Sequence, residues 1–174
     1  GLVLRFKGGY DVEFRAYDDG IAYRFVSKTK KKFNVVNEQA DFSFPFDATA
    51  SVPYTNRGDE NNIESQFFNS FENIYDTNNI SKLNKKRLMF LPLVVDAGEG
   101  VKVCITETHL ENYPGLYLSS AKGGNQLTSV FAPYPKKVEQ GGHNQLQLLV
   151  TERENYIARV DGQRSFPWRI VIVT

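Results

Sequence analysis

Strict alternation of apolar and polar residues is the feature that most constrains this fold. From Tyr10 to Tyr17 every even position is apolar, and the odd positions 11, 13 and 15 are charged. A period of two is typical of a strand with one buried face. Residues 21–26 repeat the pattern, and the intervening Asp19-Gly20 is a dipeptide that type I′ hairpin turns favour. The sequence therefore predicts a β-hairpin that turns at Asp19-Gly20.

That turn also fixes the strand register. The predicted pairs are Phe14 opposite Phe25, Ala16 opposite Tyr23, and Arg15 opposite Arg24. The aromatic pairs mark the face toward the core. Two arginines directly opposite each other repel unless an acid lies between them. We therefore expect a carboxylate-rich cover over the other face, with Glu13 as one candidate.

The rest of the chain predicts a mostly β protein. Runs of strand character, separated by Gly, Pro and Asn clusters, lie at 88–95, 101–107, 116–118, 146–151, 156–160 and 168–173. No long helical stripe interrupts them, so we expect an antiparallel β-sandwich or curved sheet. At 174 residues the chain fits one domain, 1–174.

Residues 56–87 differ from their surroundings because eight asparagines are scattered through them. We interpret this stretch as a long insertion between strands, with a short helix possible at 64–75. Its Arg57-Gly58-Asp59 tripeptide matches one used in cell adhesion. Three residues recur by chance, so the match carries no functional weight.

Charge and cysteine content exclude several classes. Lys and Arg number 21 against 20 Asp and Glu, so the formal charge is +1. Such a chain lacks the electrostatic attraction of non-specific nucleic-acid binding. Cys104 is the single cysteine, which excludes a disulfide framework. No apolar run approaches the roughly 18 residues of a membrane helix. We expect neither a nucleic-acid partner nor a membrane span.

Glu107 is the strongest candidate for chemistry. Val101, Val103, Ile105 and Glu107 share one strand face, so an apolar row ends in a carboxylate. An ionised glutamate on such a row is costly unless it is paired or binds a metal. Two interpretations stay open: Glu107 meets an arginine or water at the sheet edge, or it ligates a hard cation such as Ca²⁺.

Other candidates have simpler interpretations. Thr108 and Glu111 fit a capping box that begins a short helical turn before Pro114. His109 and His143 would have to converge with a glutamate to form a sugar-epimerase site of the mutarotase kind. A free-standing carbohydrate-binding module would instead stack sugars on aromatic side chains, and its candidate platforms are Trp168, Tyr113 and Tyr117.

Several longer strings together resemble one family. In order they are Phe14-Arg15-Ala16-Tyr17-Asp18-Asp19-Gly20-Ile21-Ala22-Tyr23-Arg24-Phe25, Ile105-Thr106-Glu107, Tyr113-Pro114-Gly115-Leu116-Tyr117-Leu118, Phe131-Ala132-Pro133-Tyr134-Pro135, Tyr156-Ile157-Ala158-Arg159 and Gly162-Gln163-Arg164-Ser165-Phe166-Pro167-Trp168-Arg169. Their order and spacing resemble the N-terminal domain of glycoside hydrolase family 97, bacterial calcium-dependent α-glucosidases and α-galactosidases.

The resemblance implies a super-sandwich domain, similar to galactose mutarotase, that packs on a (β/α)8 catalytic barrel. The barrel would hold the catalytic acid and base, so this chain alone would not hydrolyse an oligosaccharide. Glu107, at the Ile-Thr-Glu string, would lend a ligand to an active-site calcium. The resemblance also implies a periplasmic or secreted bacterial enzyme. Because family domains begin earlier, we expect an incomplete domain that exposes sheet edges or inner-face aromatics.

Overall fold

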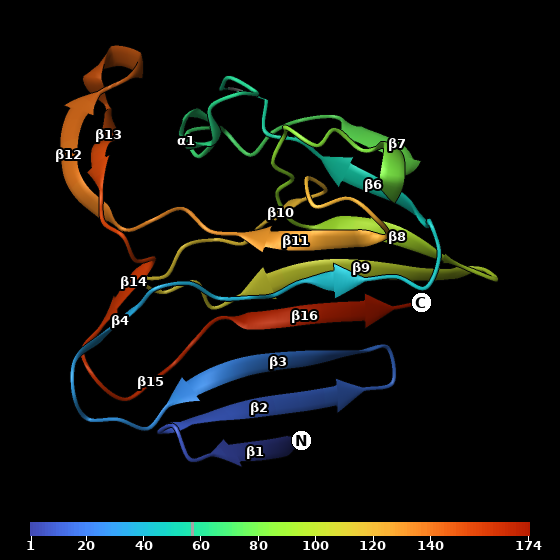
Figure 1. The fold of residues 1–174 in the computed structure, drawn as a ribbon, viewed down its shortest axis with the longest axis horizontal. Coiled ribbons are helices and arrows are strands. Elements are labelled where there is room, and N and C mark those ends of the chain that lie inside the picture. The colour runs from blue at the N-terminus through green and yellow to red at the C-terminus, as the bar shows by residue number, and fades with distance from the viewer. Residues whose placement is uncertain (57) are drawn as a thin grey trace.

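A computed structural model describes residues 1–56 and 58–174 (Figure 1). Arg57, which opens the Arg57-Gly58-Asp59 tripeptide, lies outside the described residues. The elements are β1 (Leu2–Phe6), β2 (Tyr10–Tyr17), β3 (Gly20–Ser27), β4 (Phe33–Val35), β5 (Phe42–Ser43), β6 (Thr49–Pro53), α1 (Ile63–Gln66), β7 (Tyr75–Asn79), η1 (Ile80–Lys82), β8 (Leu93–Gly98), β9 (Val101–Thr108), β10 (Tyr117–Ser119), β11 (Gln126–Val130), β12 (Pro135–Gly141), η2 (His143–Gln145), β13 (Gln147–Arg153), β14 (Ala158–Val160), β15 (Arg164–Ser165) and β16 (Trp168–Val173).

The main layer is a nine-stranded antiparallel sheet. Its order is β1-β2-β3-β16-β9-β8-β6-β7, and β15 pairs with β3 off this path. A three-stranded sheet, β10-β11-β5, forms a second layer over β6, β8 and β9. β4 pairs with β14, and β12 with β13. The predicted mostly β, antiparallel sandwich is confirmed.

The core lies between these two layers. Strand alternation sends Val52, Leu93 and Ile105 inward from the large sheet, where they meet Leu118 and Leu127 of the small one. All five side chains are completely buried. Burying each contributes about 1.5–3 kcal/mol. This packing holds the β9 end of the large sheet in place.

The first hairpin forms, but its predicted register is wrong. Tyr17 pairs with Gly20, so the turn residues are Asp18 and Asp19, and neither has a positive φ. Gly20 instead lies at the start of β3, where its lack of a side chain lets β16 pair closely with β3. A Cβ on Gly20 would lie 2.3 Å from the backbone oxygen of Val171. Glycine is therefore required here for the close approach of two strands.

The register shift changes the environment of the arginines. Arg24 lies opposite Glu13 and forms an ion pair with it, Nε to Oε2, at 2.7 Å. The guanidinium groups of Arg15 and Arg24 lie 4.7 and 4.4 Å from the ring centroid of Trp168. Glu13 therefore plays its expected part, but an indole ring takes the place of the expected carboxylate-rich cover.

Two helical predictions also differ from the structure. Thr108 is the last residue of β9, and His109 follows it with a φ of 66°. No helical turn begins there, so the capping-box interpretation is wrong. In the Asn-rich segment the helix spans only Ile63–Gln66, capped by the Asn62 side chain. None of the described helices is long and apolar enough to cross a membrane.

One face of β1, β2 and β3 is apolar and only partly covered. Leu2, Leu4 and Phe6 alternate onto this face of β1, opposite Phe14, Val12 and Tyr10 of β2. The three β1 side chains are exposed, and the Phe6 and Tyr10 rings stack at 4.9 Å. Contiguous apolar surface of this kind marks a contact with another chain or domain.

We predict that the isolated 174-residue chain self-associates through this face. Changing Leu2 and Leu4 together to lysine should reduce association, because charges on an edge strand oppose strand pairing and burial. Sedimentation velocity at several concentrations measures the effect, with Ile74→Lys as an exposed control elsewhere. A monodisperse monomer of the unmodified chain would contradict the prediction.

Candidate functional site

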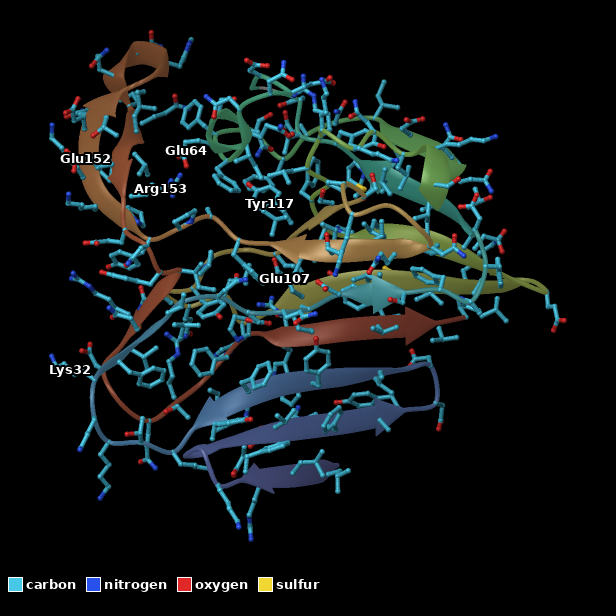
Figure 2. All side chains as sticks on the ribbon, viewed as in Figure 1. Lys32, Glu64, Glu107, Tyr117, Glu152 and Arg153 are labelled. Carbon is cyan, nitrogen blue, oxygen red and sulfur yellow. The ribbon has the colours of Figure 1, made fainter. Side chains whose placement is uncertain are left out.

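Two apolar rows on neighbouring strands end in opposite charges. The β9 row runs Val103, Ile105, Glu107, and the β16 row runs Val173, Val171, Arg169. The antiparallel register places Arg169 directly opposite Glu107. Figure 2 shows Glu107 toward the end of β9, beside β16. The same alternation that builds the sheet therefore brings this acid and base together.

Arg169 is the most enclosed charged residue in the described chain. Its side chain is 1% exposed, and Nη1 forms an ion pair with Oε2 of Glu107. On its other side it donates two bonds to Glu38, Nε to Oε1 at 2.8 Å and Nη2 to Oε2 at 2.9 Å. Such a bidentate geometry is the strongest form of this contact. One guanidinium thus bridges two carboxylates.

Glu38 is held from three directions. Besides Arg169, the hydroxyl of Tyr113 donates to its Oε2 at 2.8 Å. Its backbone carbonyl accepts a bond from Ser129 Oγ on β11 at 3.3 Å. Ser129 also binds Asp41, which fastens the 38–41 loop to the small sheet. Hydrogen bonds rather than a regular element therefore position Glu38.

Glu107 is a mostly buried carboxylate with both oxygens engaged. Its side chain is 10% exposed, and Oε1 accepts the backbone N–H of Leu116 at 2.9 Å. A Cβ on Gly115 would come within 3.3 Å of that oxygen, so glycine allows the close approach. Burial raises the pKa of Glu107 despite the opposing contacts from Leu116 and Arg169.

The charges of this cluster do not balance. Two carboxylates and one guanidinium leave one negative charge in a mostly buried site. Each carboxylate oxygen can accept more than one contact, so Glu107 retains capacity for a further ligand. Within residues 1–56 and 58–174, however, no three His, Cys, Asp or Glu side chains form a metal-binding group. Ca²⁺ takes about 6–8 oxygen ligands. Within the described residues, Glu107 therefore has too few neighbouring oxygen ligands to hold a calcium ion alone.

A second cluster lies beside Glu107 and joins it to the β12-β13 hairpin. Arg153 forms an ion pair with Glu64 at 2.6 Å, and its guanidinium lies 5.3 Å from the Phe67 ring. The Phe67 ring lies 5.6 Å from that of Tyr117. Burial raises the pKa of Tyr117, and the nearby Glu107 charge adds to the shift. Figure 2 shows Glu64, Arg153, Tyr117 and Glu107 following one another across this side of the molecule.

The other predicted site residues are not brought together. His109 directly follows β9, whereas His143 lies in η2 at the tip of the β12-β13 hairpin (Figure 1). The three candidate sugar platforms, Trp168, Tyr113 and Tyr117, are all buried. Trp168 packs against two arginines, and Tyr113 binds Glu38. None of the three presents an open ring face on which a sugar could stack.

Of the two interpretations of Glu107, the structure shows the contact with an arginine, although the sequence had not singled out Arg169 or Glu38. A signal for Arg169 was present, because it ends the row of Val171 and Val173 just as Glu107 ends its own row. Glu38 carried no such signal. It lies in an irregular loop between β4 and β5, 131 positions from Arg169, where no alternation marks a buried face.

These features define an antiparallel β-sandwich domain with one mostly buried, incompletely neutralised carboxylate at a sheet end. Comparison with known proteins identifies the family. The family model described as "Glycosyl-hydrolase 97 N-terminal" matches residues 1–174. The chain belongs to this family of N-terminal domains, which confirms the resemblance seen in the sequence.

Individual relatives agree with this assignment. The chain is 67% identical over its whole length to a retaining alpha-galactosidase of Bacteroides thetaiotaomicron, of which it covers 26%. A glycoside hydrolase family 97 enzyme from Pseudoalteromonas sp. strain K8, solved with acarbose, superposes with a TM-score of 0.67 at 18% identity. A β-arabinopyranosidase structure gives 0.69 at 22%. Both alignments cover 95% of this chain, and 21% and 25% of those chains, and they support the shared fold.

Replacing Arg169 should destabilise the domain strongly. Arg169→Met leaves the carboxylates of Glu38 and Glu107 buried without their cation. Removing one partner of a buried ion pair lowers the free energy of unfolding by about 3–5 kcal/mol. Urea unfolding followed by circular dichroism measures the loss. Lys32→Met is the control, because the Lys32–Asp161 pair at 3.1 Å is largely exposed (Figure 2). Equal stability of Arg169→Met and the wild type would contradict the ion-pair account.

Proposed function

We propose that this chain is the non-catalytic N-terminal domain of a family 97 α-glycosidase and lends Glu107 to a calcium ion at the active site. The 67% identical relative favours α-galactosidase activity on oligosaccharides over the α-glucosidase alternative. In this proposal the domain packs on a catalytic (β/α)8 barrel that carries the acid and base. The isolated chain is then inactive.

The observation that supports this proposal most strongly is the burial and charge of Glu107. It is a mostly buried carboxylate whose cluster keeps one negative charge, yet the described chain supplies no further metal-ligating side chains around it. Such a site fits a cation held jointly with a second domain. The chain spans about a quarter of the length of its relative, so a catalytic domain accounts for much of the remainder.

The residues around Glu107 fix its carboxylate for this role. Leu116 N–H holds Oε1, and the Arg169 guanidinium holds Oε2. Glu38 grips Arg169 with two hydrogen bonds, so the guanidinium cannot turn away. When bound, calcium would orient the sugar and act as a Lewis acid toward its oxygens. This chain would contribute a glutamate carboxylate that is already oriented before calcium binds.

The same proposal places the enzyme in the bacterial periplasm or outside the cell. Its support is membership of the family for which the sequence resemblance implies this location, and the 67% identical relative is bacterial.

Substituting Glu107 in the full-length enzyme tests the function. Glu107→Gln keeps the shape and the Leu116 contact but removes the charge, and Glu107→Ala removes the ligand. Both should weaken calcium affinity by at least about tenfold, and activity should fall with it. Isothermal titration of the metal-free enzyme with Ca²⁺, beside an activity assay, measures both. Glu111→Gln is the matched control, because Glu111 is exposed and four residues away.

Unchanged calcium affinity and unchanged calcium dependence in both Glu107 variants would overturn the ligand assignment. Hydrolytic activity of the isolated 174-residue chain would overturn the assignment of catalysis to a separate domain.

A further inference from the structure

The β12-β13 hairpin stands apart from the two main sheets. In the part of the chain that the structure describes, β12 and β13 pair with each other and with no third strand. Figure 1 shows the hairpin projecting from the body at the upper left. A lone two-stranded ribbon is marginally stable in water. Its persistence as an ordered arm therefore calls for support along one of its faces.

One face of this arm is apolar and exposed. Val138 lies directly opposite Val150, and Leu148 lies two residues before Val150, so all three share one face. Val138 is 47% exposed, Leu148 69%, and Leu146 near the tip 80%. Grouped exposure of this kind marks an interaction site.

Four charged side chains of the arm form ion pairs within it. Lys136 binds Glu152 at 2.8 Å, and Lys137 binds Glu139 at 2.6 Å. The surface left for a partner is therefore mainly apolar. A body with an apolar patch of its own suits this surface better than nucleic acid or a charged ligand does.

The base of the arm is anchored to the segment before it and to α1. Arg153 donates Nη1 to the carbonyl of Pro133 at 2.7 Å and pairs with Glu64. A hollow of about 1070 Å³ lies between the hairpin base and the segment that follows β9. Tyr134 and Arg153 line one side of it, and His109 and Tyr113 line the other. The arm and the segment after β9 thus border the same hollow, whose lining begins at His109, two residues after Glu107.

We infer that the apolar face of the β12-β13 hairpin, formed by Val138, Leu148 and Val150 with the exposed Leu146 just before β13, docks on the catalytic part of the same polypeptide. The inference rests on the proposed function, because the partner in that proposal is the domain that completes the calcium site at Glu107. The segment that follows Glu107 borders the same hollow as the base of the arm. The 67% identical relative is about four times as long as this chain, which leaves ample protein for that contact.

Thiol labelling of the full-length enzyme tests the contact. Leu146→Cys and Leu148→Cys place a thiol on the apolar face, and Asp18→Cys places one in the exposed β2-β3 turn at the opposite end of the molecule (Figure 1). Each variant is treated with iodoacetamide, and labelling is read by peptide mass spectrometry. The labelling rate of each thiol in the native enzyme is divided by its rate in urea, which corrects for the intrinsic reactivity of that thiol.

We expect both hairpin thiols to react at least tenfold more slowly than the Asp18→Cys thiol, at every enzyme concentration. Equal normalised rates at all three positions would overturn the inference. Protection that disappears on dilution would also overturn it, because the partner would then be a second copy of the chain.

Calcium titration of the same hairpin variants separates this inference from the proposed function. If calcium binds with wild-type affinity while the hairpin thiols react freely, the docking surface is wrong and the Glu107 assignment stands. If Glu107→Gln leaves calcium binding unchanged while the hairpin thiols are protected, the docking surface stands and the ligand assignment fails.

Discussion

The ion pairs of Arg169 with Glu38 and Glu107 hold together the end of the sandwich that carries the candidate site. The Arg169 guanidinium joins β16 to Glu107 on β9 and to Glu38 in the loop before β5. Tyr113 connects the same cluster to the loop after β9. Burying three charges has a high desolvation cost, which only well-directed hydrogen bonds offset. Here burial, which favours the neutral form, is outweighed by Glu38 and Glu107, and the pKa of Arg169 is raised.

In the function we propose, this cluster would let a sandwich domain hold a carboxylate in place for an active site that another domain provides. A carboxylate on a flexible loop would have to be ordered each time a cation bound. Glu107 instead extends from a strand, with Leu116 and Arg169 holding one oxygen each. Interactions of that kind orient a ligand before the metal arrives. The surplus negative charge then favours a cation over any neutral occupant.

The sequence predicted strands better than turns and pairs. Alternation located β16 at 168–173 and β9 to within one residue, because buried and exposed positions differ in chemistry. It misplaced the first turn, because glycine is required at position 20 by the close backbone of Val171 on β16, 151 positions away. β12 was missed, since its side chains are almost all exposed in this chain and its Lys and Glu residues hide any apolar alternation. Glu107 was singled out because a carboxylate interrupts an apolar row, and its burial and its arginine partner agree with that pattern. Glu38 lies in a loop without alternation, so no pattern could mark it.

The most direct test of this account is a crystal structure of the full-length enzyme with calcium, in which anomalous scattering locates the metal. We predict a calcium ion about 2.3–2.6 Å from a carboxylate oxygen of Glu107, with Arg169 still bound between Glu107 and Glu38. The remaining ligands should come from outside residues 1–174. A calcium ion at the active site with Glu107 turned away from it, still engaged only by Arg169 and Leu116, would contradict the account.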